Sequence, residues 1–365
     1  MQQTEVLPDT RRVPGPGRRR VLTRAVASLV APVILPCRSQ AAEADDLAEW
    51  NRFRSRFLSR DGRILDTGND GVSHSEGQGW GLFLAATLGD RGAFDRILGW
   101  TTRALRRRDD ALHAWRYVPQ ADVKVADPNN ATDGDLFIAA ALARAARRWG
   151  NPAHAEAATA IARDVLRLLV SEVDGRSVLL PGLSGFETPA SVVVNPSYYA
   201  FPALAELALL VPSPRWAQLR RDAVALLQAG RFGRWRLPPD WLQVPRTAET
   251  GLVPAPGWPA RFSFDAIRVP LYLAWGGVEA PELMASFGAY WSSFPAGAPA
   301  WIDLTNDATA PYGANPGMAA IAQLVMTTDR TPDGAAALPR IAATQDYYGA
   351  ALVMLSRIAW RESAT

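Results

Sequence analysis

Three carboxylates stand near the beginning of apolar stretches with helical periodicity. Glu76 lies in "SEGQGWGLFLAA", Asp133 in "NATDGDLFIAAALARAARRW" and Asp265 in "FDAIRVPLYLAW". Two carboxyl groups that face each other across a cleft can cleave a glycosidic bond, because one protonates the leaving oxygen while the other activates water. The residue types therefore indicate acid–base hydrolysis of a sugar polymer, provided that the helices bring the acids together.

Each acid also has a purely structural explanation. Ser73 and Glu76 fit a capping box, in which the glutamate satisfies a free backbone N–H group. Thr132 and Ser263 are candidate caps for the other two helices. A helix N-terminus favours the charged carboxylate, whereas a general acid needs a raised pKa. We therefore expect Glu76 to face an apolar, aromatic slot and not to cap its own helix.

Glycine recurs around these acids, at Gly77, Gly79, Gly81 and Gly134. A glycine in a helix interior costs about 1 kcal/mol relative to alanine, so the missing side chains must bring a compensating gain. The bare backbone either admits a large, rigid ligand or allows two helices to cross closely.

Aromatic residues gather near the same helix starts. Flat rings cover the apolar faces of pyranoses, so these side chains are candidates for contacts with a sugar chain. Core packing is the alternative for each of them. The candidates are Trp80, Trp115, Tyr198 and Tyr347.

The sequence offers few ligands for a metal ion. His74, His113 and His154 are widely spaced, and the one cysteine is Cys37. The glycines of "GQGWG" follow no predicted strand, which argues against a dinucleotide-binding loop. We therefore expect neither a metal nor a cofactor.

Helical periodicity dominates the chain beyond residue 42 and predicts an all-α fold. Short links such as "GDRG" (Gly89–Gly92) indicate antiparallel neighbours, and six such hairpins suggest a toroid of two layers. The even-numbered stretches are the more apolar, so we expect them to form an inner ring whose N-termini meet at one end. The predicted helices span residues 44–58, 76–89, 90–106, 131–149, 152–173, 197–210, 213–230, 263–275, 279–293, 314–327, 333–343 and 345–361.

The N-terminus has the pattern of an export signal over residues 1–41. The basic run Arg18–Arg20 precedes an apolar stretch from Ala25 to Leu35, and small residues follow in "RSQAAEADD". The motif "RRRVLT" is similar to a twin-arginine signal, and a disordered basic tail is the alternative. Cleavage near residue 41 would leave one catalytic domain over 42–365, and we expect a periplasmic or secreted protein.

Most of the excess positive charge lies in that same segment. The formal net charge is +3, and residues 1–41 hold seven arginines against two acids. The remainder is slightly acidic, so we expect no nucleic-acid surface. No stretch reaches the roughly 20 apolar residues that a membrane span requires. We expect a monomer without a membrane span.

Ordered motifs across residues 44–361 resemble those of glycoside hydrolase family 8, and within it most of all the bacterial endoglucanases associated with cellulose synthesis. The resemblance implies an (α/α)6 barrel and an inverting endo-β-1,4-glucanase that needs no cofactor. It implies a β-1,4-glucan chain as substrate and suggests the cellulose-export machinery as a partner. The matching segments are "SEGQGWGLFLAA", "DRGAFDRILGWTTRAL", "NATDGDLFIAAALARAARRW", "NPSYY" and "FDAIRVPLYLAW".

The resemblance also implies roles for individual residues. Glu76 matches the family's proton donor, and Asp265 matches its general base. Asp133 matches the acid that contacts the distorted sugar beside the cleaved bond. Arg268 matches the arginine one turn after the base, where it could hold Asp265 ionised.

Two aromatic residues, Trp115 and Tyr198, align with sugar-contacting positions of the family. Trp80 and Leu82 depart from the usual tyrosine and methionine of the first motif, although both keep an apolar side chain of similar bulk. These departures affect details of sugar recognition more than activity.

Other functions are compatible with parts of this pattern. The same fold could hydrolyse xylan, chitosan or mixed-linkage glucan, and the choice rests on loops such as residues 232–262. A polysaccharide lyase would use Tyr198 or Tyr347 as a base. A non-catalytic glucan-binding protein would not need all three acids.

Overall fold

The computed structural model describes residues 40–247, 250–331 and 333–363. The predicted export signal and Cys37 lie outside these residues, except that Gln40 and Ala41 begin the first helix. The α-helices are α1 (Gln40–Phe57), α2 (Ser75–Leu88), α3 (Arg91–Leu105), α4 (Thr132–Trp149), α5 (Pro152–Asp164), α6 (Phe201–Leu210), α7 (Pro214–Ala229), α8 (Arg268–Trp275), α9 (Pro281–Ser292), α10 (Pro316–Met326) and α11 (Tyr347–Ser363).

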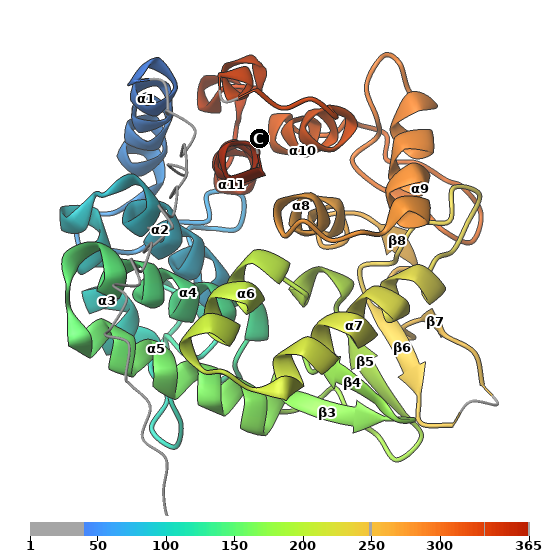
Figure 1. Ribbon diagram of the computed structural model, residues 1–365, viewed down its shortest axis with the longest axis horizontal. Helices are drawn as coiled ribbons and strands as arrows, with labels where there is room; N and C mark the ends of the chain where they lie inside the picture. Colours follow the sequence, from blue (N-terminus) through green and yellow to red (C-terminus); the bar gives the residue numbers. More distant parts are fainter. Residues whose placement is uncertain (1–39, 248–249, 332, 364–365) are drawn as a thin grey trace, which may run out of the picture. The chain divides into compact units, whose positions relative to one another are not determined.

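The helices of the unit formed by Arg38–Thr365 lie in two layers (Figure 1). In the inner layer α2, α4, α6, α8, α10 and α11 contact one another in turn, and α11 returns to α2. The outer helices α1, α3, α5, α7 and α9 each pack on an inner helix. This closed inner ring with an outer shell is the predicted (α/α)6 fold.

The inner and outer helices differ in how much of their surface is buried. The inner helix α4 buries every residue from Thr132 to Ala143. The outer helix α3 instead buries a stripe that includes Phe94, Ile97 and Thr101 and leaves its other face to solvent. Spacings of three and four residues are typical of a helix with a single buried face. The contrast in composition between alternate helices therefore predicted the layers correctly.

The glycines allow two inner helices to cross at short range. A Cβ atom on Gly134 would lie 2.7 Å from the backbone nitrogen of Glu76, and one on Gly79 would lie 2.9 Å from the carbonyl oxygen of Gly134. Such distances are shorter than side chains tolerate, so α2 and α4 can approach only because both positions lack a side chain. Of the two predicted explanations, the structure supports helix crowding.

Three helix predictions need correction. The stretch 263–275 is helical only from Arg268, so Asp265 lies in the turn before α8. Residues 333–343 form no α-helix but two short 3₁₀ segments, η3 (Gly334–Ala337) and η4 (Ile341–Ala343). Pro339 accounts for the break, because proline disfavours helical backbone at the preceding residue, and Leu338 is extended. The stretch 152–173 is helical only to residue 169, since α5 passes into the π-helical η1 (Val165–Leu169) and then into a strand.

Short antiparallel strands occupy the connections and position loop residues. β1 (Ser73–His74) pairs with β2 (Arg116–Tyr117), and β5 (Ser191–Val194), β6 (Leu242–Pro245) and β7 (Val253–Pro254) form a three-stranded sheet. The remaining pairs are β3 (Val170–Val173) with β4 (Arg176–Leu179) and β8 (Arg261–Phe262) with β9 (Ile302–Asp303). A 3₁₀ turn, η2 (Pro196–Tyr198), leads from β5 towards α6.

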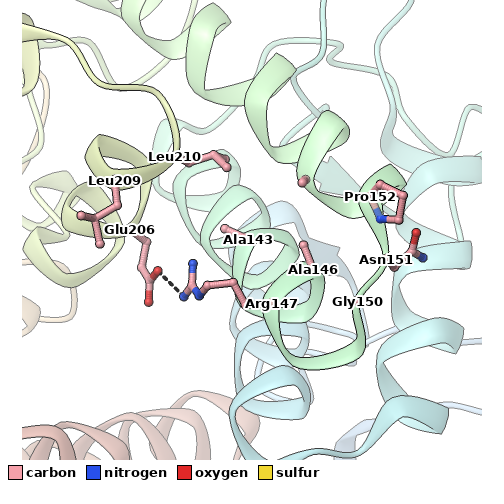
Figure 2. A pocket seen from close by; sticks show the side chains of 10 residues that line it. Ala143, Ala146, Arg147, Gly150, Asn151, Pro152, Glu206, Leu209 and Leu210 are labelled. Atoms are coloured by element: carbon pink, nitrogen blue, oxygen red, sulfur yellow. Dashed lines mark hydrogen bonds and ion pairs between the residues drawn. The ribbon is translucent and has the colours of Figure 1, made fainter.

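An ion-pair network joins the C-terminal halves of the inner helices. Arg144 of α4 bonds Glu206 of α6 at 2.8 Å and Glu362 of α11 at 2.5 Å, and Trp275 of α8 donates to Glu362. Arg147 also reaches Glu206, at 2.6 Å, beside a shallow pocket (Figure 2). The network ties four inner helices together at the end opposite their N-termini.

None of the described helices combines the length and apolar character that crossing a membrane requires.

Candidate active site

Arg268, the first residue of α8, joins the N-terminal ends of the inner helices. Its Nη1 donates to the carboxylates of Glu76 and, at 3.3 Å, of Asp133. Its Nη2 donates to the Ser197 hydroxyl at 2.8 Å and to Asp265 at 2.6 Å. The starts of α2, α4 and α8 and the turn before α6 therefore meet around one guanidinium. The predicted acids come together at the predicted end of the ring.

The three acids differ in their access to solvent. The side chains of Glu76 and Asp265 are 20% and 32% exposed, whereas that of Asp133 is 2% exposed. Glu76 and Asp265 bond different terminal nitrogens of Arg268, so the guanidinium lies between them. The site thus presents two accessible carboxylates, with a third buried beneath them.

Burial and neighbouring charges set the protonation of this group. Burial and the Glu76 carboxylate raise the pKa of Asp133 well above its usual range, although Arg268 opposes the rise. Desolvation also raises the pKa of Asp265, and the guanidinium of Arg268 and the side chain of Asn195 act in the opposite direction. The surroundings thus favour the protonated form of Asp133 more strongly than that of Asp265.

Glu76 does not cap its own helix, whereas Asp133 accepts a hydrogen bond from the Gly134 N–H group in the first turn of α4 at 2.8 Å. No side chain caps α2, and the Ser73 hydroxyl donates instead to the carbonyl oxygen of Ile64 at 2.6 Å. The Thr132 hydroxyl likewise donates to the Leu180 carbonyl at 2.6 Å. The capping-box explanation of Glu76 is wrong, and its carboxylate points towards the arginine.

Two predicted sugar-binding aromatics are buried in the protein. Trp80 is 0% and Tyr347 is 2% exposed, and their rings stack with centroids 6.4 Å apart. The Arg268 guanidinium lies over the Trp80 ring, 5.5 Å from its centroid. Their predicted contact with sugar is therefore wrong for this structure, because both side chains point into the converging helices. The ring of Trp80 instead packs against the guanidinium of Arg268.

The other two predicted aromatics remain partly accessible. Trp115 stacks on His74 at 6.1 Å and donates its indole N–H to Asp127 at 2.7 Å. Tyr198 lies beside the site, with the Arg268 guanidinium 6.0 Å from its ring centroid. Both side chains are only partly buried, and their contact with a sugar chain stays a prediction.

The histidines make structural contacts. His113 Nδ1 lies 2.9 Å from Asp135, which also accepts a hydrogen bond from Asn130, and His74 lies 3.8 Å from Asp66. No group of three or more His, Cys, Asp or Glu side chains is arranged as metal ligands among the described residues. The described residues thus offer no cluster that could hold a metal ion.

A recess of about 490 Å³ lies next to the acids, at the starts of α10 and α11. Phe264, which precedes Asp265, and Tyr312 line it and are 42% and 54% exposed. Asn315 and Asp346 supply polar groups to its wall. The Tyr348 hydroxyl donates to the carbonyl oxygen of Phe264, which fixes the boundary between recess and site.

Comparison with known proteins decides the family. The model of glycosyl hydrolases family 8 matches residues 21–362. The chain belongs to this family. A probable endoglucanase of Novacetimonas hansenii is 46% identical over 315 residues, which are 86% of this chain and 90% of the relative. An endoglucanase of Cellulomonas uda is 39% identical over 82% of this chain and 83% of its own.

A solved structure agrees in fold as well. The endo-β-1,4-glucanase CMCax from Acetobacter xylinum superposes with a TM-score of 0.83 at 44% identity, covering 88% of this chain and 99% of that one. The glycosidase family and the (α/α)6 fold that the sequence predicted are both confirmed.

One carboxylate of this family 8 site was not predicted. Asp240 accepts hydrogen bonds from the backbone N–H groups of Ser263 at 3.0 Å and Ala266 at 2.8 Å, and from the Ser263 hydroxyl. It thereby holds the turn that carries Asp265, a place where Ser263 had been expected to act as the cap. Burial and the nearby Asp265 raise the pKa of Asp240 to about 7. Asp240 lies in a long connection between helices, where no helical periodicity identifies it as a site residue.

Proposed function

We propose that this family 8 chain is an inverting endo-β-1,4-glucanase that hydrolyses internal bonds of a cellulose-type glucan. The observation that carries the proposal is the pair of accessible carboxylates, Glu76 and Asp265, held by the two terminal nitrogens of Arg268. The substrate class is supported by the similarity to CMCax, which is an endo-β-1,4-glucanase.

The reaction is a single displacement. Glu76 donates a proton to the glycosidic oxygen while the bond between that oxygen and the anomeric carbon breaks. A water molecule on the opposite face of the ring bonds the anomeric carbon and gives a proton to Asp265. The configuration at that carbon is therefore inverted, and carboxyl groups about 6.5–9.5 Å apart leave room for the water.

The neighbouring groups support these two roles. Arg268 bonds Asp265 at 2.6 Å, and its positive charge favours the ionised base. Asp133 is buried with a raised pKa and a hydrogen bond to Glu76, so it keeps a proton beside the acid. We assign Asp133 to holding Glu76 in place, in addition to the sugar contact that the family resemblance implies.

Surfaces on both sides of the acids favour attack within a chain. Around the inner ring α8 lies between α6 and the α10–α11 pair. Tyr198 stands on the α6 side, and the recess with Phe264 and Tyr312 lies on the α10–α11 side. A glucan that passes over Asp265 would meet accessible aromatic rings in both directions, as cleavage of internal bonds requires.

Export is part of the proposal. The basic and apolar N-terminal pattern over residues 1–41 supports a periplasmic or secreted enzyme. The proposal also takes the enzyme to be a monomer, with the cellulose-export machinery as its partner. Cell fractionation with and without residues 1–41 tests this part independently of activity.

The catalytic roles are tested by Glu76→Gln and Asp265→Asn on carboxymethylcellulose. Each variant should lose about 10²–10⁴-fold in the rate of reducing-sugar release, because each removes one proton transfer. Glu156→Gln, an exposed carboxylate on the outer helix α5, is the matched control and should keep normal activity.

Other outcomes would favour other functions. Near-normal rates in either variant would refute the assignment. A product that absorbs in the ultraviolet would indicate a lyase, and binding of cello-oligosaccharides without release of reducing sugar would indicate a glucan-binding protein.

A further inference from the structure

Four aromatic side chains form one connected group next to the site, in which Tyr198, Phe186 and Trp258 each contact Trp241. Tyr198 lies 6.3 Å from Trp241, centroid to centroid, and Trp241 stacks on Trp258 at 5.1 Å with an interplanar angle of 21°. Phe186 stacks on Trp241 at 5.8 Å and 2°. These four residues, Tyr198, Trp241, Trp258 and Phe186, are called the aromatic row below.

The inner end of the row is fixed at the catalytic group. Tyr198 lies against Arg268, and Trp241 directly follows Asp240, whose carboxylate holds the turn that carries Asp265. The β5–β6 pairing sets Val194 opposite Leu242 and so brings the two chain segments together. Tyr198 and Trp241 therefore connect the aromatic row to the surroundings of the acids.

The outer end of the row is presented to solvent. Trp258 is 36% exposed, although a large apolar ring gains little by remaining at the surface. It lies in the segment "PAPGWPA", where prolines on both sides and Gly257, with φ +90°, restrict the backbone. Stacking on Trp241 holds the indole in one orientation, so it is ordered before any ligand arrives.

We propose that the aromatic row is a distal glucan-binding surface that makes this enzyme favour long chains over short oligosaccharides. This proposal rests on the proposed function. The ligand is a β-1,4-glucan, whose successive rings present flat apolar faces to Trp258 and Tyr198 while hydroxyl groups remain at the edges. Core packing explains Trp241, which is half-buried, but it does not require the exposed Trp258.

The test separates binding from catalysis. In a Glu76→Gln background, the affinity for carboxymethylcellulose is measured by affinity electrophoresis for Trp258→Ala, Trp258→Phe and the control Leu209→Ala. Leu209 is 78% exposed beside the pocket of Figure 2, at the other end of the inner ring. We expect Trp258→Ala to weaken binding about three- to tenfold and Trp258→Phe to restore most of it, with no change in the control.

The same variants in the active enzyme are then compared on long and short substrates. Trp258→Ala should lower kcat/KM on the polymer by a similar factor and leave hydrolysis of cellotetraose unchanged. Unaltered binding, or an equal loss on both substrates, would overturn the distal surface. If the unmodified enzyme hydrolyses no β-1,4-glucan, the proposed function fails instead, whatever the binding shows.

Discussion

At the scale of single residues, the site depends on Arg268. Its guanidinium is 2% exposed and bonds three acids and one hydroxyl from four chain segments. A planar group with several fixed donors can do this, whereas the single ammonium of lysine cannot satisfy the same acceptors. The arginine therefore both assembles the acids and balances their charge.

Replacing Arg268 should disable the enzyme in a pH-dependent way. We expect Arg268→Ala to lower kcat by about 10²-fold or more, because it leaves buried carboxylates without a partner. Arg268 lowers the pKa of Asp265, so its removal raises that pKa and moves the acid limb of the kcat/KM profile to higher pH. Arg268→Lys should shift the limb less. An acid limb that stays in place in both variants would contradict this role.

Asp240 gives a second prediction at this scale. Its pKa is raised from 3.8 to about 7, so its contribution to stability is complete below the usual value and is lost as the pH rises through about 7. Asp240→Asn cannot ionise but keeps an acceptor for the backbone N–H groups. The melting temperature of Asp240→Asn relative to the unmodified protein should therefore increase between pH 5 and pH 8. An equal difference at both pH values would show that Asp240 does not titrate there.

The sequence revealed the charged residues of the site better than the aromatic ones. Glu76 and Asp133 were recognisable because they begin helices that had to converge, and Asp265 precedes one. Trp80 occupies a similar place but points inward, and a helical position near the N-terminus does not tell which way a ring faces. Asp240 lies in an irregular connection, where no periodicity links it to the turn that it holds.

At the scale of secondary structure, the crossing of α2 and α4 places Glu76 against Asp133. The contact depends on glycine at positions 79 and 134, whose added Cβ atoms would meet backbone and side-chain atoms of the other helix. The glycines near the acids are thus explained by geometry of the helix pair. The glycines in a helical pattern indicated that something packs closely against the backbone. Only the structure showed that this is the neighbouring helix and not a ligand.

Gly134→Ala should disturb both stability and activity. The new methyl carbon would overlap the Ser75 hydroxyl, so the helices must separate at a cost of about 1–3 kcal/mol. Thermal unfolding and carboxymethylcellulose hydrolysis measure the two effects. The matched control is Gly288→Ala in α9, where nothing lies within 4 Å and the higher helix propensity of alanine should stabilise by about 0.5–1 kcal/mol. Equal effects of the two substitutions would contradict the crowding argument.

Most helix boundaries followed from periodicity, and the exceptions have local causes. Pro339 breaks the stretch 333–343, while residues 170–173 pair with β4 instead of extending α5. Strand pairing joins residues distant in the sequence, as in Val194 with Leu242, so single-segment patterns could not predict it.

At the scale of the whole domain, a closed inner ring fixes the acids relative to one another. Glu76 lies on α2 and Asp265 lies in the turn before α8, and these two helices are not neighbours in the ring, since α4 and α6 lie between them on one side. Their separation therefore depends on ring closure and on the ion-pair network at the opposite end, around Arg144 and Glu362. Fold class, layers and the convergence of helix starts were predictable from the sequence, whereas this separation was not.

The stereochemistry of the product tests the central claim most directly, because it reports whether a water molecule is activated between Glu76 and Asp265. The measurement is proton NMR of the anomeric signals during the first minutes of cello-oligosaccharide hydrolysis. Because the reaction inverts the anomeric carbon, we expect the α-anomer of the new reducing end to appear first and the β-anomer to follow by mutarotation. Initial appearance of the β-anomer would contradict it.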